Sequence, residues 1–351
     1  MTTVFSRRRI ITLFVALVTL MALLAPSPAQ AKFKSKRELT VMSQNLYLGA
    51  SLTPAIAATT PQEFFAALNG ILFEFTLTDY PRTRSGAIAN EIAASSPDLI
   101  GLQEVSIWTL VPPGGPPVVV DFLAILQQQL AARGFSYSAV AVSDNADIAA
   151  PLPDGTLIRF QDRDVILKND ATDGLQITHD ESGAFTAQQL LPTPVGPLSF
   201  DRGWVLVDGT FEGKRFRFVN THLETEDFTA VQEAQAAEFL AGPARAPGAV
   251  IAVGDFNSAA DGSTTDSYRM LTRPRQFDDA WEVNSGLEGY TCCQDSSLTN
   301  AISELDSRID LVLLGGPVRT VSAVVVGSTP LIGLPNWPSD HAGVVATVRV
   351  H

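Results

Sequence analysis

Residues 252–257 read A-V-G-D-F-N, an apolar run that stops at Asp255 and Asn257. The run is short, rich in valine and followed by polar residues, which predicts a buried β-strand over 250–253. A strand end is held by its sheet yet open to solvent, so polar side chains placed there are well positioned for chemistry. Taken alone, the stretch is explained equally well as an Asx turn, in which Asp255 bonds nearby backbone.

The same arrangement recurs along the chain. Other predicted strands also end beside side chains that bind metals or move protons: Asn45, Glu104, His222, Asp310, Asp340 and His341. Each has a simple structural explanation, such as a turn for Asn45 or an ion pair with Arg308 for Asp310. Turn chemistry does not explain why so many runs end in this way. The joint pattern therefore predicts that these side chains converge on one functional site.

Apolar runs alternate with helical patterns over most of the sequence. Strands are predicted at 39–44, 99–103, 137–142, 157–167, 204–211, 215–221, 250–253, 309–314, 318–326 and 343–350. Helices are predicted at 61–72, 84–94, 122–133 and 229–240. Mixed strand order with helices between the strands favours one α/β domain, in which helices pack outside two sheets.

The first residues are typical of an export signal rather than of the folded domain. Arg7, Arg8 and Arg9 precede an apolar run at 10–24, and an A-x-A cleavage site follows at 29–31. The run is shorter than the ~20 residues that a membrane anchor needs. We expect a signal peptide over 1–31, removed by either the general or the twin-arginine route, and a secreted single catalytic domain over 32–351.

Composition limits the classes of partner. The net charge is −13, with 46% hydrophobic residues, enough for a large core. Proteins that grip long nucleic acids usually present a basic face, and no such pattern is visible here. The two cysteines, Cys292 and Cys293, are adjacent. Neighbouring Cα atoms lie ~3.8 Å apart, less than a usual disulfide spans, so a vicinal disulfide and two free thiols both stay open.

The polar residues at the strand ends suit phosphoester hydrolysis. Oxygen ligands without cysteine favour Mg²⁺, Mn²⁺ or Ca²⁺ over structural zinc. Hydrolysis of a phosphoester requires a cation at the phosphate oxygens, a positioned water and hydrogen-bond donors for the developing charge. Acyl transfer would need an activated nucleophile, but the sequence contains no G-x-S-x-G motif and no P-loop.

At these residues the chain resembles the endonuclease/exonuclease/phosphatase superfamily, which includes deoxyribonucleases, abasic-site endonucleases, neutral sphingomyelinases and inositol-polyphosphate phosphatases. The matching segments, in the order of the family, are S-Q-N at 43–45, Q-E-V at 103–105, N-T-H-L-E at 220–224, G-D-F-N-S at 254–258, S-R-I-D-L-V at 307–312 and S-D-H-A at 339–342. The resemblance implies a four-layer α/β/β/α sandwich, with two facing mixed β-sheets and helices outside.

The resemblance also implies a metal site. Glu104 and Asn45 look like the metal ligands, and Asp340 joins them directly or through water. The ion implied is Mg²⁺, with Mn²⁺ or Ca²⁺ as alternatives, and the resemblance leaves open whether one or two ions bind.

The remaining residues of the pattern look like catalytic residues. By resemblance, Asp255 aligns or deprotonates the attacking water, while Asn257 and His222 bind the scissile phosphate. His341 contacts the phosphate or transfers a proton, and Asp310 holds it in one tautomer. Either Asp255 or His341 can serve as the general base.

The substrate class stays open at this stage. The expected substrate is a phosphoester, whether a phospholipid head group, a small phosphoester or nucleic acid, cleaved by phosphodiesterase or phosphatase activity. An extracellular nuclease is the alternative, followed by a catalytically silent binding module. Apolar stretches at 108–120 and 331–337 could contact lipid or belong to the core. Nothing indicates an obligate protein partner, and a monomer is expected.

Overall fold

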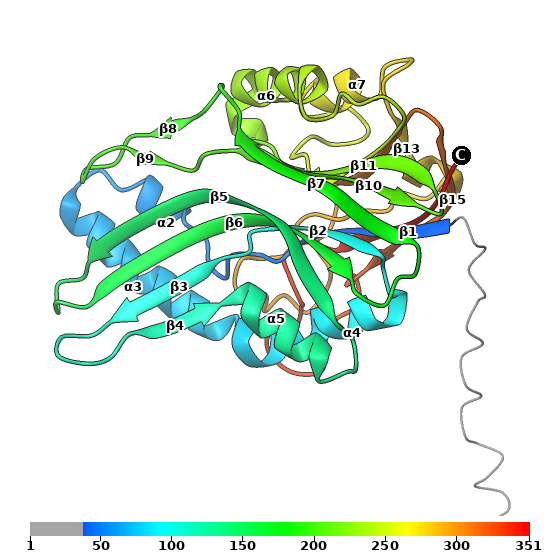
Figure 1. Cartoon of the computed structure of the whole chain (residues 1–351). Coiled ribbons are helices and arrows are strands. Elements are labelled where there is room, and N and C mark those ends of the chain that lie inside the picture. The colour runs from blue at the N-terminus through cyan, green and yellow to red at the C-terminus, as the bar shows by residue number, and fades with distance from the viewer. Residues whose placement is uncertain (1–37) are drawn as a thin grey trace, which may run out of the picture. The chain divides into compact units, whose positions relative to one another are not determined.

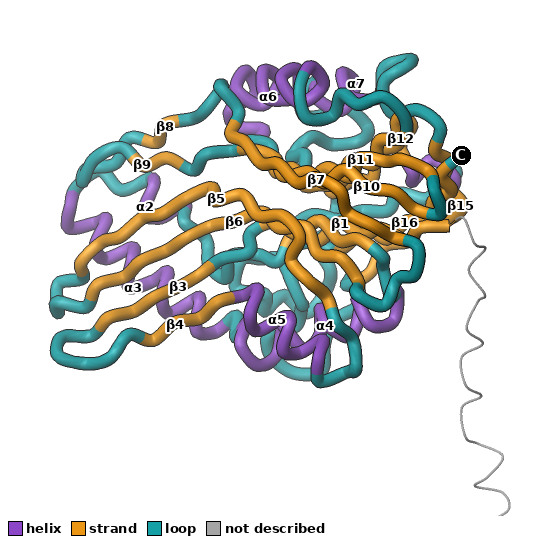
Figure 2. Tube along the Cα trace, viewed as in Figure 1, coloured by secondary structure: helices purple, strands orange, loops and turns teal. Residues whose placement is uncertain are grey.

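A computed structural model of the chain describes residues 38–351, and the signal peptide expected over 1–31 lies outside them. In the described part, two β-sheets face each other and helices cover both outer faces, which gives four layers (Figure 1). Strands occupy the centre and helices the outside (Figure 2). The predicted α/β/β/α sandwich is therefore confirmed.

The first sheet, sheet A, has eight strands in the order β15-β16-β1-β2-β6-β3-β4, with β5 paired to β6. Their bounds are β1 Glu38–Asn45, β2 Leu99–Gln103, β3 Ile107–Val111, β4 Val118–Asp121, β5 Tyr137–Pro151, β6 Leu157–Asn169, β15 Val318–Val326 and β16 Gly343–Val350. Strand β1 is parallel to β2 and antiparallel to β16. The carboxyl ends of β1 and β2 therefore meet at one edge of the sheet.

The second sheet, sheet B, has six strands in the order β13-β14-β12-β11-β10-β7. Their bounds are β7 Leu175–Ala184, β10 Gly203–Phe211, β11 Lys214–His222, β12 Ala249–Asp255, β13 Asp278–Asp279 and β14 Asp310–Gly315. A short pair, β8 Leu190–Leu191 and β9 Leu198–Ser199, lies outside both sheets. Strands β10 and β11, predicted as strands at 204–211 and 215–221, pair as an antiparallel hairpin.

The helices flank both sheets. On the side of sheet A they are α2 Thr53–Ile56, α3 Pro61–Leu77, the π-helical turn η1 Tyr80–Arg84, α4 Ser85–Ser95 and α5 Phe122–Ala131. On the side of sheet B they are η2 Glu226–Phe228, α6 Thr229–Ala241 and α7 Ser267–Leu271, whereas η3 Ala280–Asn284 contacts β15 of sheet A and β14 of sheet B. Helix α3 starts at a capping box between Thr60 and Glu63. Within residues 38–351, no helix is long and apolar enough to cross a membrane.

The two sheets come very close behind the ends of β1 and β2. A Cβ atom on Gly101 would lie 2.4 Å from the Val253 side chain, so only glycine permits this approach. The amide of Asn220 on sheet B donates to the Leu102 carbonyl of sheet A at 2.9 Å. Gln103 donates back to Asn220 Oδ1 at 2.6 Å. These buried polar contacts hold the two sheets in one register.

Several strands were missed or underestimated by the sequence analysis. Strand β7 is mostly exposed, reads L-Q-I-T-H-D-E-S-G-A and has no apolar run. The second half of β5 also carries polar residues between its apolar ones. Edge strands of this kind have one solvated face, so their hydrophobic signal is weak.

Candidate active site

Three of the predicted residues lie side by side at the ends of neighbouring strands of sheet B. His222 of β11 pairs with Asp255 of β12, and Asp255 pairs with Asp310 of β14. Residues in register on adjacent strands point to the same face, so the three side chains share one surface. His222 Nε2 lies 3.5 Å from Asp255 Oδ2, and all three residues are buried.

Sheet A adds Asn45 and Glu104 to the same place. The Asn45 amide nitrogen donates to Glu104 Oε1 at 3.2 Å and to Asp255 Oδ2 at 3.1 Å. Glu104 directly follows β2 in a left-handed conformation, with φ +55°, and its Oε2 accepts from the Leu48 N–H at 2.6 Å. Asn45 is therefore the side chain that joins the polar ends of the two sheets.

The loop before β16 completes the cluster with Asp340 and His341. His341 Nδ1 lies 2.8 Å from Asp310 Oδ2, and its Nε2 lies 3.8 Å from Asp255 Oδ2 and 4.0 Å from Asp340 Oδ1. Ser339 anchors this loop, because its hydroxyl donates to the Asn45 carbonyl at 2.8 Å.

Asn257 lies at the rim of the site. Its backbone N–H donates to Asp255 Oδ1 at 2.9 Å, so the Asx turn considered for this stretch is present. Its side-chain amide donates to the Leu223 carbonyl at 2.9 Å. Asp255 Oδ1 forms the turn, while Oδ2 faces Asn45 and the two histidines. Asp255 can therefore take part in the turn and in the site together. The structure thus brings all eight sequence-predicted residues into one contiguous cluster.

The two histidines have opposite charge preferences. Burial lowers the pKa of His222 well below its ordinary value, and the positive charges of Arg202 and His341 lower it further. Burial also acts to lower the pKa of His341, but the carboxylates of Asp310 and its acidic neighbours outweigh this and raise it well above the ordinary value. A neutral and a protonated imidazole therefore lie in the same site.

The carboxylates indicate how the site fits a cation. Burial raises the pKa of Asp255 to about 7, with a further contribution from Asp310. Burial likewise raises the pKa of Asp340 to about 7, with a contribution from Glu104. Carboxylates buried so close together are costly unless a positive charge compensates them. The donor set therefore suits a hard divalent cation.

Two groups of residues could hold that cation. Ligand atoms of Asp255, Asp310 and His341 all lie within 4.8 Å of one another. Because His341 and Asp310 already bond each other, this group is better described as a proton-transfer network. The oxygen donors next to it are those of Glu104 and Asp340, the residues that the sequence indicated together with Asn45.

The two cysteines also border the site. They form a disulfide, one of the two alternatives left open by the sequence, and both sulfur atoms lie 3.8 Å from His341 Nε2.

Further charged residues near the site were missed by the sequence analysis. Arg202 directs a guanidinium nitrogen to Glu224 Oε1 at 3.4 Å, and its Nε has no hydrogen-bond partner among residues 38–351. Asp162 and Asp164 are buried on one face of β6, and burial raises the pKa of Asp162 to about 7. The signal for the two acids is their i, i+2 spacing on the face of β6 that also carries the buried Ile158 and Phe160. Arg202 follows a Pro-rich loop, where no periodic pattern distinguishes it.

Comparison with known proteins identifies the family of the chain and agrees with its fold. The model of the Endonuclease/Exonuclease/phosphatase family matches residues 68–341. Humanized TDP2 of D. rerio has 16% identity and a TM-score of 0.54, covering 90% of this chain and 100% of its own. A protein of this family from Bacteroides vulgatus has 15% identity and a TM-score of 0.53, covering 91% and 100%. Another, from Beutenbergia cavernae, has 21% identity and a TM-score of 0.55, covering 90% and 72%. No curated protein sequence matches the chain significantly.

Proposed function

The chain belongs to the endonuclease/exonuclease/phosphatase family, and from this premise we propose that it hydrolyses a phosphoester bond with water and a divalent cation. The activities in the family's name are hydrolyses of phosphoester bonds. The observation that supports the proposal most is the convergence of strand ends from both sheets, where Asn45 contacts Glu104 and Asp255 together. Such a cluster combines cation ligands, a base and donors, the parts that phosphoester hydrolysis requires.

Glu104, Asn45 and Asp340 would hold the cation, which we propose to be Mg²⁺, with Mn²⁺ or Ca²⁺ as alternatives. The bound ion would neutralise charge on the non-bridging phosphate oxygens. Glu104 is well placed for this, because the Leu48 N–H fixes one of its carboxylate oxygens.

The protein's own residues would position the water and move the protons. Asp255, held by Asn45 and by the Asn257 backbone, takes the proton of the attacking water. Asp310 orients His341, whose Nε2 then faces the site and donates to a phosphate oxygen as negative charge develops.

The phosphate itself would be bound by His222 and Asn257. Both lie beside Asp255, one through its ring and one through its backbone. His222 Nδ1 is buried and has no hydrogen-bond partner in the described part of the chain. An ordered water would satisfy Nδ1, whereas Nε2, 3.5 Å from Asp255 Oδ2, is the nitrogen that would meet a phosphate oxygen.

Turnover of bis-(p-nitrophenyl) phosphate tests the proposal. We expect EDTA to abolish turnover, added Mg²⁺ to restore it, and Glu104→Ala and His341→Ala each to lower the rate at least about 10²-fold. His179→Ala and Glu181→Ala are matched controls, because these side chains are 54% and 55% exposed on β7. Equal rates in all four variants, with and without EDTA, would refute the proposal.

A substrate panel separates the finer alternatives. Plasmid DNA, sphingomyelin and inositol phosphates should be assayed side by side, together with p-nitrophenyl phosphate to distinguish monoesterase from diesterase activity. The net charge of −13 disfavours tight binding of DNA. We therefore expect the DNA reaction to be the slowest of the panel.

We also propose that the protein is exported, with residues 32–351 as a single catalytic domain. The support is the order of Arg7–Arg9, the apolar run 10–24 and the A-x-A site at 29–31. Mass spectrometry of protein recovered from the culture medium should give a chain that begins at Lys32. Retention in cells with residues 1–31 still attached would contradict this.

A further inference from the structure

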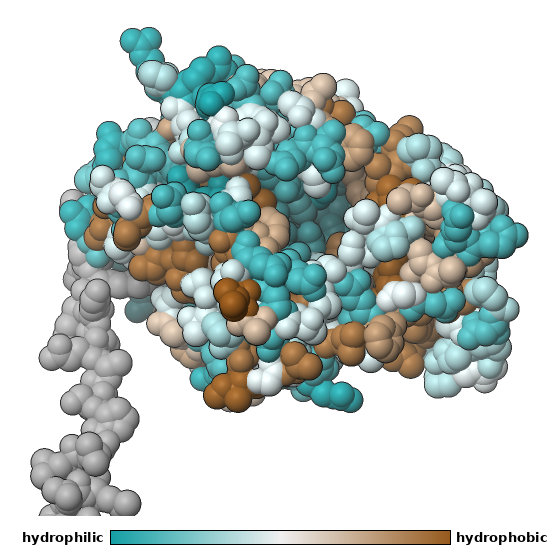
Figure 3. All heavy atoms as spheres, turned by 180° about the vertical axis from the view of Figure 1, so that it is seen from behind, coloured by the Kyte–Doolittle hydropathy of each residue, from teal (hydrophilic) through white to brown (hydrophobic). Residues whose placement is uncertain are grey.

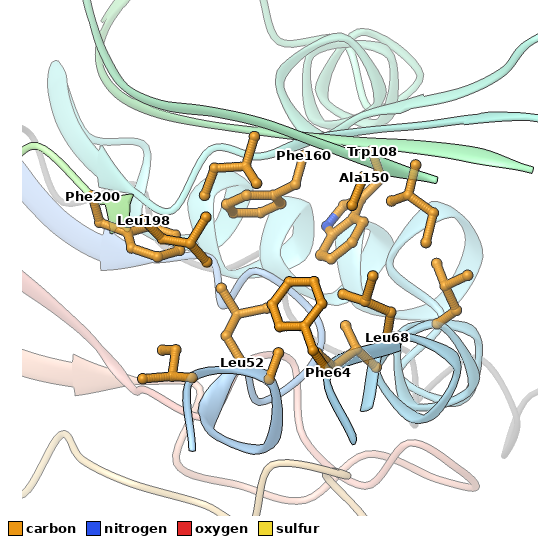
Figure 4. A pocket seen from close by; sticks show the side chains of 14 residues that line it. Leu52, Phe64, Leu68, Trp108, Ala150, Phe160, Leu198 and Phe200 are labelled. Carbon is orange, nitrogen blue, oxygen red and sulfur yellow. The ribbon is translucent and has the colours of Figure 1, made fainter. Parts of the chain in front are cut away.

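An apolar pocket lies beside the active site, between helices α2–α3 and the strands β3, β5 and β6 (Figure 4). Its cavity volume is about 60 Å³, and every one of the 14 lining side chains is hydrophobic. Phe64, Trp108 and Phe160 point toward one another across it, and Leu198 and Phe200 close one side (Figure 4). A volume of 60 Å³ equals that of about two water molecules in the liquid, so the pocket admits the end of a hydrocarbon chain and not a whole small ligand.

Two chain segments lead from the pocket into the active site. Phe160 lines the pocket, and Asp162 follows two residues later on the same face of β6. Phe200 also lines the pocket, and Arg202 follows two residues later, next to Glu224. Two residues of extended chain span roughly 7 Å. The hydrophobic end of a ligand in this pocket would therefore lie within a few bond lengths of the charged residues.

A hydrogen-bond chain connects the pocket to the proposed metal site. Trp108, which lines the pocket, donates its Nε1–H to the Leu48 carbonyl at 2.9 Å. The Leu48 N–H in turn donates to Glu104 Oε2 at 2.6 Å. Trp108 uses its one polar atom in this bond, so it presents only hydrocarbon to the pocket.

Exposed aliphatic residues surround the same end of the molecule. Val118 and Val119 of β4 are each 56% exposed, Leu157 at the start of β6 is 42% exposed, and Leu190 of β8 is 61% exposed. Strand β4, the start of β6 and strand β8 lie toward the left in Figure 1, with α2 and α3. Seen from behind, apolar residues line the right-hand side of a hollow in the surface (Figure 3). Such groupings mark contact surfaces more often than scattered residues do.

We propose that this pocket receives part of one hydrocarbon chain, a few carbons long, of an amphiphilic phosphoester whose phosphate lies in the active site. The inference rests on the proposed function for its phosphate end. A hydrocarbon chain gains from burial here, whereas a nucleobase would leave its polar edges without hydrogen-bond partners against a wholly apolar lining. The net charge of −13 also disfavours a polyanionic ligand.

Chain-length dependence of hydrolysis tests the inference. The probes are n-alkyl p-nitrophenyl phosphates from methyl to octyl, kept below their aggregation concentrations, with the same leaving group throughout. We expect kcat/KM to rise by up to about fourfold for each added methylene until the pocket is full. Values that do not depend on chain length would overturn the inference.

A variant that fills the pocket gives the matched control. Ala150 lines the pocket from β5, whereas its neighbour Ala149 is exposed on the other face of the strand. Ala150→Phe should remove the gain from longer chains and leave the methyl ester rate unchanged. Ala149→Phe should behave like the unchanged protein. An undiminished chain-length gain in a folded Ala150→Phe protein would contradict the proposal.

A binding measurement without turnover keeps the test independent of folding in the variants. Calorimetry of the unchanged protein in EDTA should show octylphosphocholine binding at least tenfold more tightly than phosphocholine. Equal affinities would overturn the inference. Binding without hydrolysis of any phosphoester would refute the proposed function but support the pocket. Hydrolysis without any preference for the octyl chain would support the proposed function and refute the inference about the pocket.

Discussion

Arg84 offers the sharpest test of how the site is held in place. It is fully buried at the end of η1, and its guanidinium donates to the backbone carbonyls of Leu46, Tyr47 and Pro338, at 3.0 Å for Tyr47 and 2.9 Å for Pro338. These carbonyls belong to two loops, one directly after Asn45 and one directly before Ser339. Arg84 therefore joins the segments that position two of the proposed metal ligands.

The loss of stability in Arg84→Met can be calculated from the three backbone carbonyls that lose their hydrogen-bond donor. Each buried carbonyl that loses its donor costs about 1–3 kcal/mol, which gives roughly 6 kcal/mol for the three of them. Part of this is recovered, because a buried guanidinium is itself unfavourable, and burial lowers the pKa of Arg84. We expect a net loss of about 4 kcal/mol in the free energy of unfolding. The thermal midpoint should fall by roughly 6 °C.

Urea unfolding measures this loss, and Arg82→Met is the control, because Arg82 is an exposed arginine of the same turn. The Mg²⁺ concentration for half-maximal activity should also rise in Arg84→Met, because both ligand loops lose their tie. Arg84→Lys should recover only part of each effect, since lysine cannot reach three carbonyls as a planar fork. If Arg84→Met and Arg82→Met unfold within about 1 kcal/mol of each other, the reasoning fails.

Three other changes have defined outcomes. Burial raises the pKa of Glu91 to about 7 from 4.5, so the folded state loses stability as pH rises between these values. Glu91→Gln should stabilise the protein by up to about 3 kcal/mol at pH 8 and by nothing near pH 4, as read from urea unfolding at both values. Thr60→Ala removes the capping box of α3 and should cost about 1 kcal/mol in the same assay, whereas no loss would mean that Glu63 alone caps the helix. Asp310→Asn should lower kcat by about 10²–10⁴-fold while KM changes little, because His341 loses the group that orients it; an unchanged kcat in steady-state assays would exclude that role.

The sequence predicted the centre of the fold well because that part carries its own signal. Strand β12 is buried on both faces and reads as an unbroken apolar run that ends at Asp255. Edge strands such as β7 have no such run, since their stability comes from pairing with β10. Pairing between strands that are far apart in the sequence produces no periodic hydrophobic pattern from which such a strand could be predicted.

The site was predicted only in part, for a related reason. Side chains at the ends of central strands could be recognised, but Arg202 and Asp162 join the site through contacts that only the fold creates. The apolar pocket could not be predicted at all, because its lining has the same pattern as ordinary core. The apolar stretch 331–337 divides in the structure: Trp337 is buried, while Ile332 is fully exposed.

Because the two sheets approach closely at Gly101, the catalytic rate depends strongly on how the sheets are aligned with each other. Asn45 reaches across this junction to Asp255, so a relative slip of the layers by about 1 Å would misplace base and cation ligands together, at a cost of roughly 10²-fold in rate. Such a slip needs far less energy than melting either sheet. Under gradual heating or mild denaturant, catalysis should therefore disappear while the circular dichroism of the strands is still intact.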